Sequence, residues 1–354
     1  MPGSSGPVVG CISLEPWDEV WRRNQHFAWQ LVEQGLVSRL VFVEPPRLGE
    51  RPRRWSPQPG IQVVRPLLPA PKRLGGLQLA GVLLRQTVLR RIDVLWVNDA
   101  TLGRHCVRKG AQAVYDVTDD WRTFDNPPYI RQRIVSAEDA LARQAGTIVC
   151  SEVLAQRWED RYGARPPVVQ NAVDLSAFKD VIPHKLDGPG PHVGYVGTLH
   201  SQRLDVDLVL RLARELGGAV HLVGPDSLDS ESRQRLAAEP RVHLHGPVPA
   251  SEVPGWMTAM DVLVCPHLVN DFTLSLDAIK AHEYAAAGRP VVATPTSGFQ
   301  LLDDAGIVVA PAEGFVAAAG AAVGGGGPAQ RPTGWPERAR AFSGCLLDPE
   351  PACA

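Results

Sequence analysis

Short apolar runs alternate with amphipathic stretches along most of this chain of 354 residues. In the first half, the runs are rich in Val and Ile, which is typical of strands buried on both faces. The strands predicted there lie at 8–13, 40–45, 61–64, 93–98, 113–117 and 147–151. Between them, stretches such as 19–35 and 130–143 have the periodicity of sheet-covering helices. The alternation predicts a parallel sheet with helices on both faces.

The same alternation begins again after the Pro- and Gly-rich segment at 187–191. The strands predicted in this half lie at 192–197, 219–224, 241–246, 261–266, 290–294 and 306–310, with helices at 205–216 and 277–287. We therefore expect an α/β protein of two Rossmann-like domains, residues 1–172 and 173–315, facing a central cleft. The pattern then decays into AAAGAAVGGGGPAQRP, so 316–354 is predicted to be a flexible linker and a C-terminal segment.

Composition narrows the class of protein. With 44% hydrophobic and 21% charged residues the chain is globular, and a net charge of -2 gives no general attraction to nucleic acid. The six cysteines form no C-x-x-C pair and have no histidine at metal-ligand spacing, so no metal site is expected. The N-terminal sequence lacks a basic segment before an apolar core, and no apolar run reaches the roughly 18 residues of a membrane span. We expect a cytoplasmic protein.

The common phosphate-binding motifs are absent. No G-x-G-x-x-G opens a helix after a strand, and no G-x-x-x-x-G-K-[ST] occurs, which disfavours a dinucleotide dehydrogenase and an ATPase. The segment GYVGTLH at 194–200 does run from a predicted strand toward a helix. Gly197 would let backbone amides approach a phosphate at that helix start, although a glycine in this position more often serves only a tight strand-to-helix turn.

Several motifs in a fixed order carry a resemblance to a known family. The second half contains QNAVDLSAF, VGYVGTLHSQRLD, VHLVGP, HLHGPVPASEVPGWMTAMDVLVCP and DAIKAHEYAAAGRPVVATP. They resemble the C-terminal half of GT-B glycosyltransferases of the glycogen-synthase-like superfamily. The first half, with WDEVWRRNQHFAWQLVEQG, LVFVEPP, VLWVND and VYDVTDDW, resembles the bacterial polysaccharide and teichuronic-acid branch.

This resemblance covers residues 8–315 and implies an activity. A GT-B enzyme moves a sugar from a nucleoside diphosphate sugar to a hydroxyl acceptor, here a glycan, a lipid-linked molecule or a secondary metabolite. It generally needs no bound metal or cofactor, since the nucleotide sugar is a co-substrate. Two alternatives stay open: a nucleotide-sugar epimerase of the same fold, and a non-catalytic partner that binds a nucleotide sugar.

The resemblance assigns the donor side to the second half. Glu283 stands where the family has a glutamate that holds the ribose hydroxyls, and a carboxylate can accept from two neighbouring hydroxyls. Lys280, one helical turn earlier, is a candidate for neutralising the diphosphate or orienting Glu283. The alternatives are a glutamate stabilised by the helix dipole and an ion pair on the helix surface. A second family glutamate is replaced here by Ser275.

The segment after GYVG departs from the family pattern. Retaining members usually carry an arginine and, five positions later, a lysine, and this chain has Thr198 and Arg203 there. Arg203 can stabilise the charge that develops on the leaving diphosphate, whereas Thr198 offers only a hydroxyl. The donor side is thus predicted to comprise Gly197, Thr198, Arg203, Lys280 and Glu283. Both a retaining and an inverting mechanism remain open.

Candidates for the acceptor side lie in the first half. VYDVTDDW at 114–121 carries three carboxylates around a predicted strand end, and such a group could deprotonate an acceptor hydroxyl. Asp119 is favoured as this base and Asp116 is the second candidate, while an Asp-rich turn is the alternative. Further acceptor-side candidates are His26, Asn98, Asp99 and Asp120.

Residues 47–91 contain ten Lys or Arg residues against the single acid Glu50. Together with the apolar residues of LGGLQLAGVLLRQTVLRR, this charge would suit peripheral contact with an anionic membrane that holds a lipid-linked acceptor. A solvated basic face over an ordinary helix is the alternative. Because no recognition motif accompanies the charge, nucleic acid is not an expected partner.

Overall fold

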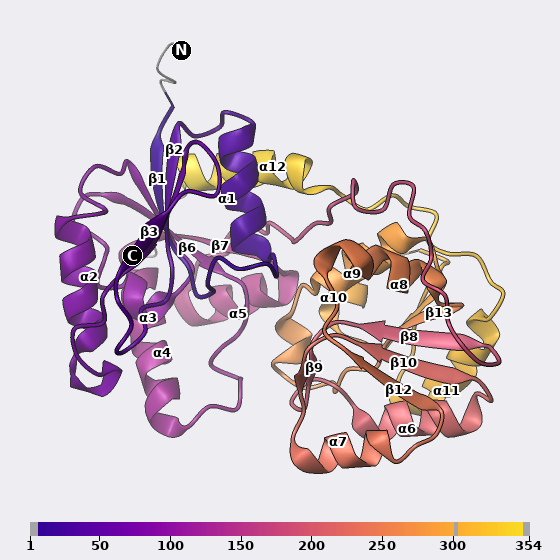
Figure 1. The fold of residues 1–354 in the computed structure, drawn as a ribbon. Helices are drawn as coiled ribbons and strands as arrows, with labels where there is room; N and C mark the ends of the chain where they lie inside the picture. The colour runs from indigo at the N-terminus through magenta and orange to yellow at the C-terminus, as the bar shows by residue number, and fades with distance from the viewer. Residues whose placement is uncertain (1–5, 301–303, 350–354) are drawn as a thin grey trace. The chain divides into compact units, whose positions relative to one another are not determined.

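The computed structural model describes residues 6–300 and 304–349. They form two compact units: unit 1 runs to Gln170 and resumes at Trp335, and unit 2 is Asn171–Gly334. Each unit is built on a mostly parallel sheet with helices, as the alternating pattern predicted (Figure 1). Along the chain, unit 1 gives way to unit 2 between residues 170 and 171, close to the boundary expected after residue 172.

The sheet of unit 1 has seven strands in the order β3-β4-β2-β1-β5-β6-β7. They are β1 (Val8–Ile12), β2 (Arg39–Val43), β3 (Arg53–Trp55), β4 (Ile61–Arg65), β5 (Val94–Val97), β6 (Gln112–Val117) and β7 (Gly146–Val149). All except β3 coincide with predicted strands, because residues buried on both faces give continuous apolar runs. The sequence analysis missed β3, whose residues RRW are largely exposed and pair antiparallel with β4 at the sheet edge.

Six helices of the described residues belong to unit 1. They are α1 (Arg23–Glu33), α2 (Gly76–Gln86), α3 (Ala100–Gly103), α4 (Pro128–Ala142), α5 (Glu152–Tyr162) and α12 (Trp335–Leu347), with the 3-10 helix η1 (Lys72–Leu74). Helix α12 returns from the far end of the chain. Its Phe342 ring stacks on Phe27 of α1 with centroids 4.3 Å apart and lies 4.9 Å from Trp96 of β5. Helix α12 is therefore part of the core of unit 1.

The structure differs from the expectation that 316–354 forms a flexible linker and a terminal segment. Helix α11 (Ala312–Ala322) runs through the alanine-rich stretch and buries Phe315 and Ala319 in unit 2. Helix α12 then packs in unit 1. Because alanine and glycine give little contrast between buried and exposed positions, the sequence pattern concealed α11. The last five residues of this segment, 350–354, lie outside the described part.

The sheet of unit 2 has six strands in the order β12-β10-β8-β13-β14-β15, all paired in parallel. They are β8 (His192–Val196), β10 (Ala219–Val223), β12 (Val242–Gly246), β13 (Val262–Cys265), β14 (Val291–Ala293) and β15 (Ile307–Val309). Besides α11, its helices are α6 (Val206–Glu215), α7 (Ser230–Ala237), α8 (Val253–Ala259), α9 (Ile279–Ala287) and α10 (Ser297–Gln300). Short pieces are β9 (Leu199–His200), β11 (Asp226–Ser227), η2 (Ala250–Glu252) and η3 (Thr273–Ser275).

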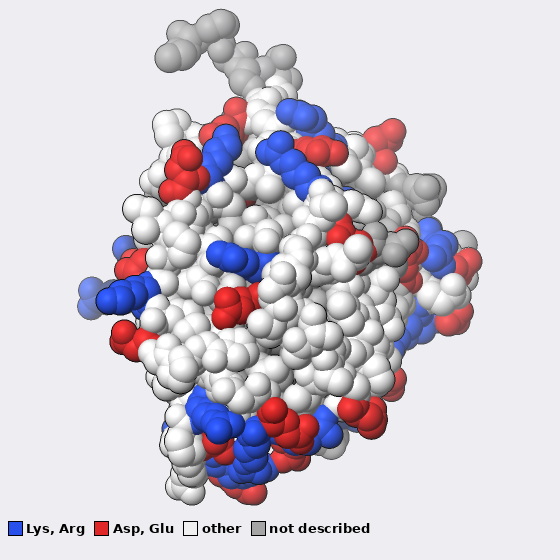
Figure 2. All heavy atoms as spheres, turned by 90° about the vertical axis from the view of Figure 1, so that its right-hand side faces the viewer, with Lys and Arg blue, Asp and Glu red and all other residues white. Residues whose placement is uncertain are grey.

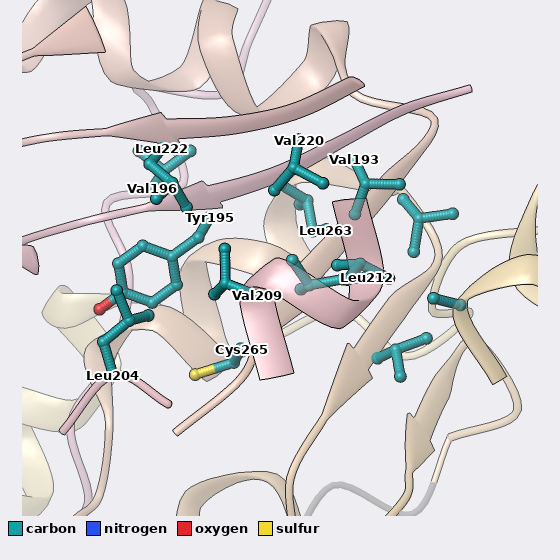
Figure 3. Packing of buried hydrophobic residues seen from close by; sticks show 14 of the residues in the cluster. Val193, Tyr195, Val196, Leu204, Val209, Leu212, Val220, Leu222, Leu263 and Cys265 are labelled. Carbon is teal, nitrogen blue, oxygen red and sulfur yellow. The ribbon is translucent and has the colours of Figure 1, made fainter. Parts of the chain in front are cut away.

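The core of unit 2 includes the contact between α6 and its sheet. Figure 3 shows Val209 and Leu212 of α6 among the side chains of the strands, with the Tyr195 ring of β8 beside Leu204. These residues are almost completely buried. The amphipathic pattern of α6 places them on one face, so a helix was correctly predicted at 205–216.

The surface shows no extended patch of one charge on the face drawn in Figure 2. Lys and Arg side chains are intermingled there with Asp and Glu, between wide areas that carry neither. Such a face gives little general attraction to a polyanion.

Within the described residues, every helix is too short or too polar to cross a bilayer.

Candidate functional site

Two glycines end neighbouring strands of unit 2 and bring their loops into contact. Gly197 follows β8 with a φ of 147°, and Gly224 follows β10 with a φ of 141°. The Gly197 amide donates to the carbonyl oxygen of Val223 at 2.7 Å. A Cβ at Gly224 would lie 2.3 Å from the Gly197 carbonyl oxygen, so a side chain does not fit there. Gly224 is buried under this contact, whereas Gly197 stays partly exposed, so a phosphate can approach the backbone at Gly197.

The side chain of Lys280 lies directly against Gly197. A Cβ at Gly197 would be 2.1 Å from Cε of Lys280 and 2.3 Å from its Nζ. Burial acts to lower the pKa of Lys280, but the acidic groups of Tyr195, Cys265 and Glu283 outweigh it and raise the pKa above its ordinary value. In residues 6–300 and 304–349 the ammonium forms no ion pair with a carboxylate, so the ion pair on the helix surface is not observed.

Arg203 supplies a second cation near this edge of the sheet. It precedes Asp205, the N-cap of α6, and its guanidinium carbon lies 5.1 Å from the ring centroid of Phe272. Its Nε is buried and has no hydrogen-bond partner among the described residues, which is a costly state for a charged donor. Burial, Lys280 and Arg203 together lower the pKa of His267 to about 3. The two cations therefore act on the same region, and an anion bound there would satisfy both.

Helix α9 places Glu283 one turn after Lys280. The helix dipole stabilises a carboxylate mainly in the first turn of a helix. Helix α9 begins at Ile279, so Glu283 lies beyond that turn. Its side chain is partly buried, and burial raises the pKa of the carboxyl, while Lys280 and His282 act in the opposite direction. The dipole explanation is therefore disfavoured. A partly buried carboxylate beside a cation is suited to accept from hydroxyl groups of a ligand.

The two positions that depart from the family pattern differ in their surroundings. Thr198 is exposed next to Gly197, and its carbonyl oxygen accepts from the Tyr195 hydroxyl at 3.2 Å. Ser275 is buried, and its hydroxyl donates to the carbonyl oxygen of Phe272 at 2.7 Å within η3. Thr198 can thus contact a ligand through its hydroxyl, whereas Ser275 supports the local backbone.

The structure contradicts the prediction of Asp116 as a catalytic base. Its carboxylate is fully buried inside unit 1. It accepts from Nε and Nη2 of Arg23 at 3.1 and 3.0 Å, and from the Trp96 indole at 3.2 Å. A carboxylate closed off in this way cannot reach an acceptor hydroxyl. Asp116 lies within β6 and faces the protein interior, which the number of carboxylates in VYDVTDDW did not reveal.

Asp120 also serves the structure of unit 1. Its buried carboxylate accepts from Nη1 of Arg157 at 2.9 Å and from Nη2 of Arg161 at 2.8 Å, both on α5. These bonds tie the turn after β6 to helix α5. Removing one partner of a buried ion pair is strongly destabilising. The interpretation of an Asp-rich structural turn therefore applies to Asp120, against the prediction of an acceptor-side role.

Three further acceptor-side candidates have structural contacts instead. The amide oxygen of Asn98 accepts from Asn24 at 2.7 Å, and Asp99 caps α3. The His26 ring stacks on Trp335 of α12 with centroids 4.4 Å apart. Each contact lies within unit 1, and none of the three side chains needs a ligand to explain its position.

Asp119 is placed differently from its neighbours. It is partly exposed, and one of its carboxylate oxygens accepts from the Thr118 hydroxyl at 3.1 Å. Among the three carboxylates of this segment, it is the one whose side chain reaches solvent. Its catalytic role stays a prediction.

Comparison with known families covers the part of the chain that holds the residues predicted for the donor side. Residues 190–323 match the family model described as Glycosyl transferases group 1. Residues 190–323 are similar to this family and are called the group 1 domain. Gly197, Thr198, Arg203, Lys280 and Glu283 all lie in this group 1 domain. The resemblance on which their assignment depends is thereby confirmed.

Two curated relatives of the chain carry glycosyltransferase names. TuaH of Bacillus subtilis (strain 168), named for teichuronic acid biosynthesis, is 29% identical over 200 residues, 52% of this chain and 50% of TuaH. D-inositol 3-phosphate glycosyltransferase of Arthrobacter sp. (strain FB24) is 35% identical over 115 residues, 32% of this chain and 25% of the relative. The matched segments thus span half of the relatives' length or less.

Solved structures establish the fold in which the group 1 domain stands. Sucrose-phosphate synthase from Thermosynechococcus elongatus has a TM-score of 0.70 at 16% identity, over 96% of this chain and 94% of its own. Anabaena Alr3699/HepE in complex with UDP and glucose has a TM-score of 0.63 at 16% identity, over 96% and 95%. At such low identity the similarity concerns the fold. It confirms the predicted GT-B architecture of two Rossmann-like domains.

Two residues of the group 1 domain escaped the sequence analysis. The Tyr195 hydroxyl lies 3.2 Å from Nε2 of His267, next to the cations described above. A tyrosine in an apolar strand is typical of a core residue, and His267 belongs to no motif, so neither residue gave a signal.

No group of three or more His, Cys, Asp or Glu side chains in the described ranges is arranged to hold a metal ion.

Proposed function

We propose that this protein transfers a sugar from a nucleoside diphosphate sugar to a hydroxyl acceptor, with no cofactor besides that co-substrate. The observation that carries the proposal is the pair of cations in the group 1 domain: Lys280 lies against Gly197, and Lys280 and Arg203 both act on His267. A diphosphate matches them in charge and offers several acceptor oxygens. The bond from the sugar to the diphosphate breaks, a bond to the acceptor oxygen forms, and the acceptor proton goes to a base.

The geometry supports the following proposed roles on the donor side. Lys280, Arg203 and the backbone around Gly197 and Thr198 bind the diphosphate, and Glu283 accepts from the ribose hydroxyls. Because negative charge grows on the diphosphate as it leaves, fixed cations stabilise the transition state more than the ground state. In support, two proteins of similar fold bind nucleotide sugars: Anabaena Alr3699/HepE was solved in complex with UDP-glucose, and the E. coli trehalose-6-phosphate protein was solved with UDP-2-fluoro glucose.

Unit 1 is proposed to bind the hydroxyl acceptor, with Asp119 as the base of an inverting reaction. The TuaH relative, named for teichuronic acid biosynthesis, favours an acceptor of polysaccharide synthesis. The comparisons give no support to the epimerase alternative. Incubating the protein with a panel of nucleotide sugars and hydroxyl acceptors should yield a glycosylated product and a nucleoside diphosphate. A protein that binds the nucleotide sugar but forms no product with any acceptor would instead be the non-catalytic partner.

Glu283→Gln is expected to keep the fold but weaken nucleoside diphosphate binding. The amide retains one acceptor oxygen but loses the charge that strengthens its bonds to hydroxyls. The expected loss is about 1.5–3 kcal/mol, or roughly 10- to 150-fold in Kd, measured by calorimetry. The 2′,3′-dideoxy form of the same nucleotide serves as the control, because it should bind both proteins equally. Equal affinity of both proteins for the natural nucleotide would remove Glu283 from the site.

Unit 1 carries a surface that suits peripheral contact with an anionic membrane. Helix α2 buries one face, yet Leu79 and Leu83 on its other side are 51% and 45% exposed, and Leu74 is 68% exposed. Lys72 and Arg73 are exposed beside them. Leucines that can enter the interface, flanked by cations that attract anionic headgroups, are the two requirements for such binding. This contact would bring the enzyme to a lipid-linked acceptor at the inner face of the membrane.

The double substitution Leu79→Ser and Leu83→Ser is expected to lower binding to vesicles rich in anionic phospholipid about tenfold or more, because the apolar contribution is lost. Both side chains are exposed, so the fold should be retained. Sedimentation with vesicles measures the effect. Val20→Ser, a change at another exposed apolar residue of unit 1, is the control. If the wild-type protein stays in solution with anionic and with uncharged vesicles alike, the membrane proposal is wrong.

A further inference from the structure

The aromatic ring of Tyr195 forms a surface under the Lys280 ammonium group. Tyr195 lies on β8 and is only 2% exposed, and Figure 3 shows its ring in the core with the hydroxyl pointing away from β8. Nζ of Lys280 lies 5.3 Å from the ring centroid. A cation at this distance over an aromatic face is attracted by the ring, and more strongly when water is excluded.

The Tyr195 hydroxyl joins two loops of the site. It donates to the carbonyl oxygen of Thr198 at 3.2 Å and contacts Nε2 of His267 at the same distance. Both contacts are satisfied if the Nε2–H of His267 donates to the phenol oxygen. His267 is fixed in turn, since its backbone amide donates to the Thr294 hydroxyl at 3.1 Å. One side chain therefore links the turn after β8 to the loop after β13.

The side chains of Tyr195 and His267 are uncharged, although they lie beside the cations Lys280 and Arg203. Burial raises the pKa of Tyr195, although Lys280 acts to lower it. Burial, with Lys280 and Arg203, lowers the pKa of His267 to about 3. At neutral pH the phenol is protonated and the imidazole uncharged, so neither neutralises the cations. The positive charge of Lys280 remains available to a ligand, while its position is constrained by the ring and by Gly197.

We infer that Tyr195 is a positioning residue for the diphosphate site. Its ring holds the Lys280 ammonium at the end of β8. The hydroxyl, which contacts Thr198 and His267 and not the ammonium, contributes less to the preference for a diphosphate. Without the ring, the flexible lysine side chain would have to be ordered by the ligand itself, which reduces affinity. The inference rests on the proposed function, because it specifies how the diphosphate site of that function is assembled.

The test compares two ligands that differ by one phosphate. The probes are the best-bound nucleoside diphosphate among UDP, GDP and ADP, and the corresponding monophosphate. Tyr195→Met removes the aromatic face but fills the core with an adaptable side chain. It is expected to weaken diphosphate binding about 2- to 30-fold more than monophosphate binding, the range of a cation–π contact. Tyr195→Phe keeps the ring and should preserve the preference for the diphosphate within about twofold.

A double-mutant cycle with Lys280→Met then asks whether Tyr195 acts through Lys280. If it does, Tyr195→Met should have little further effect on diphosphate preference once the lysine is absent. Additive effects would overturn the inference, and so would equal losses for both ligands, which indicate a general structural role. Loss of the preference in Tyr195→Phe would overturn the assignment to the ring, and this variant retains the core volume. If the wild-type protein binds none of the diphosphates, it is the proposed function itself that fails.

Discussion

Replacing Lys280 by methionine is expected to lower the turnover number of sugar transfer by about 10²- to 10³-fold, as removal of one preorganised charge-stabilising group does in other enzymes. The ammonium is held against Gly197 and over Tyr195 before any ligand arrives. It therefore needs little reorganisation when charge develops on the diphosphate. Because Arg203 remains, part of the stabilisation should persist, and the loss should be greater in turnover than in donor affinity.

The measurement is single-turnover transfer at saturating donor, with donor affinity determined separately. Lys179→Met is a matched control, because Lys179 is an exposed lysine of the same unit. A Lys280→Met protein whose affinity falls while its turnover is intact would make Lys280 a ground-state anchor. Unchanged affinity and turnover together would remove Lys280 from the site.

Asp119→Asn is expected to lower turnover by about 10²- to 10⁴-fold if the reaction is inverting, with little change in donor affinity. An inverting transfer needs a base near the acceptor hydroxyl, and Asp119 is the partly exposed carboxylate of the segment after β6. The asparagine has nearly the same shape but cannot accept the proton at neutral pH. In that case the product formed by the wild-type protein should have the opposite anomeric configuration to the donor sugar.

Asp125→Asn is the control for this experiment, because Asp125 is an exposed aspartate of the same loop. Asp116→Asn and Asp120→Asn are less suitable, since each breaks a buried contact with arginine and should act on stability. Near wild-type turnover of Asp119→Asn would show that no carboxylate base is supplied here. The reaction would then be retaining, with the leaving diphosphate as the base and Arg203 among the groups that stabilise it.

Several expectations for unit 1 show what local patterns conceal. VYDVTDDW presents three carboxylates in five positions, and the sequence treats them alike. In the structure Asp116 pairs with Arg23, which is far away in the chain, and Asp120 pairs with arginines of α5. Such partners are decided by packing and not by neighbouring residues. A count of carboxylates at a strand end therefore overestimates the number available for catalysis.

The sequence by itself determined the features that depend on neighbours in the chain. Apolar runs identified the parallel strands, because strands buried on both faces are continuous in sequence, and the ordered motifs of the second half carried the resemblance to GT-B glycosyltransferases. Only the tertiary structure decided that α12 completes unit 1 and that Tyr195 and His267 meet beside Lys280. These contacts join residues from separate elements, and the burial that creates them leaves no periodic trace in the sequence.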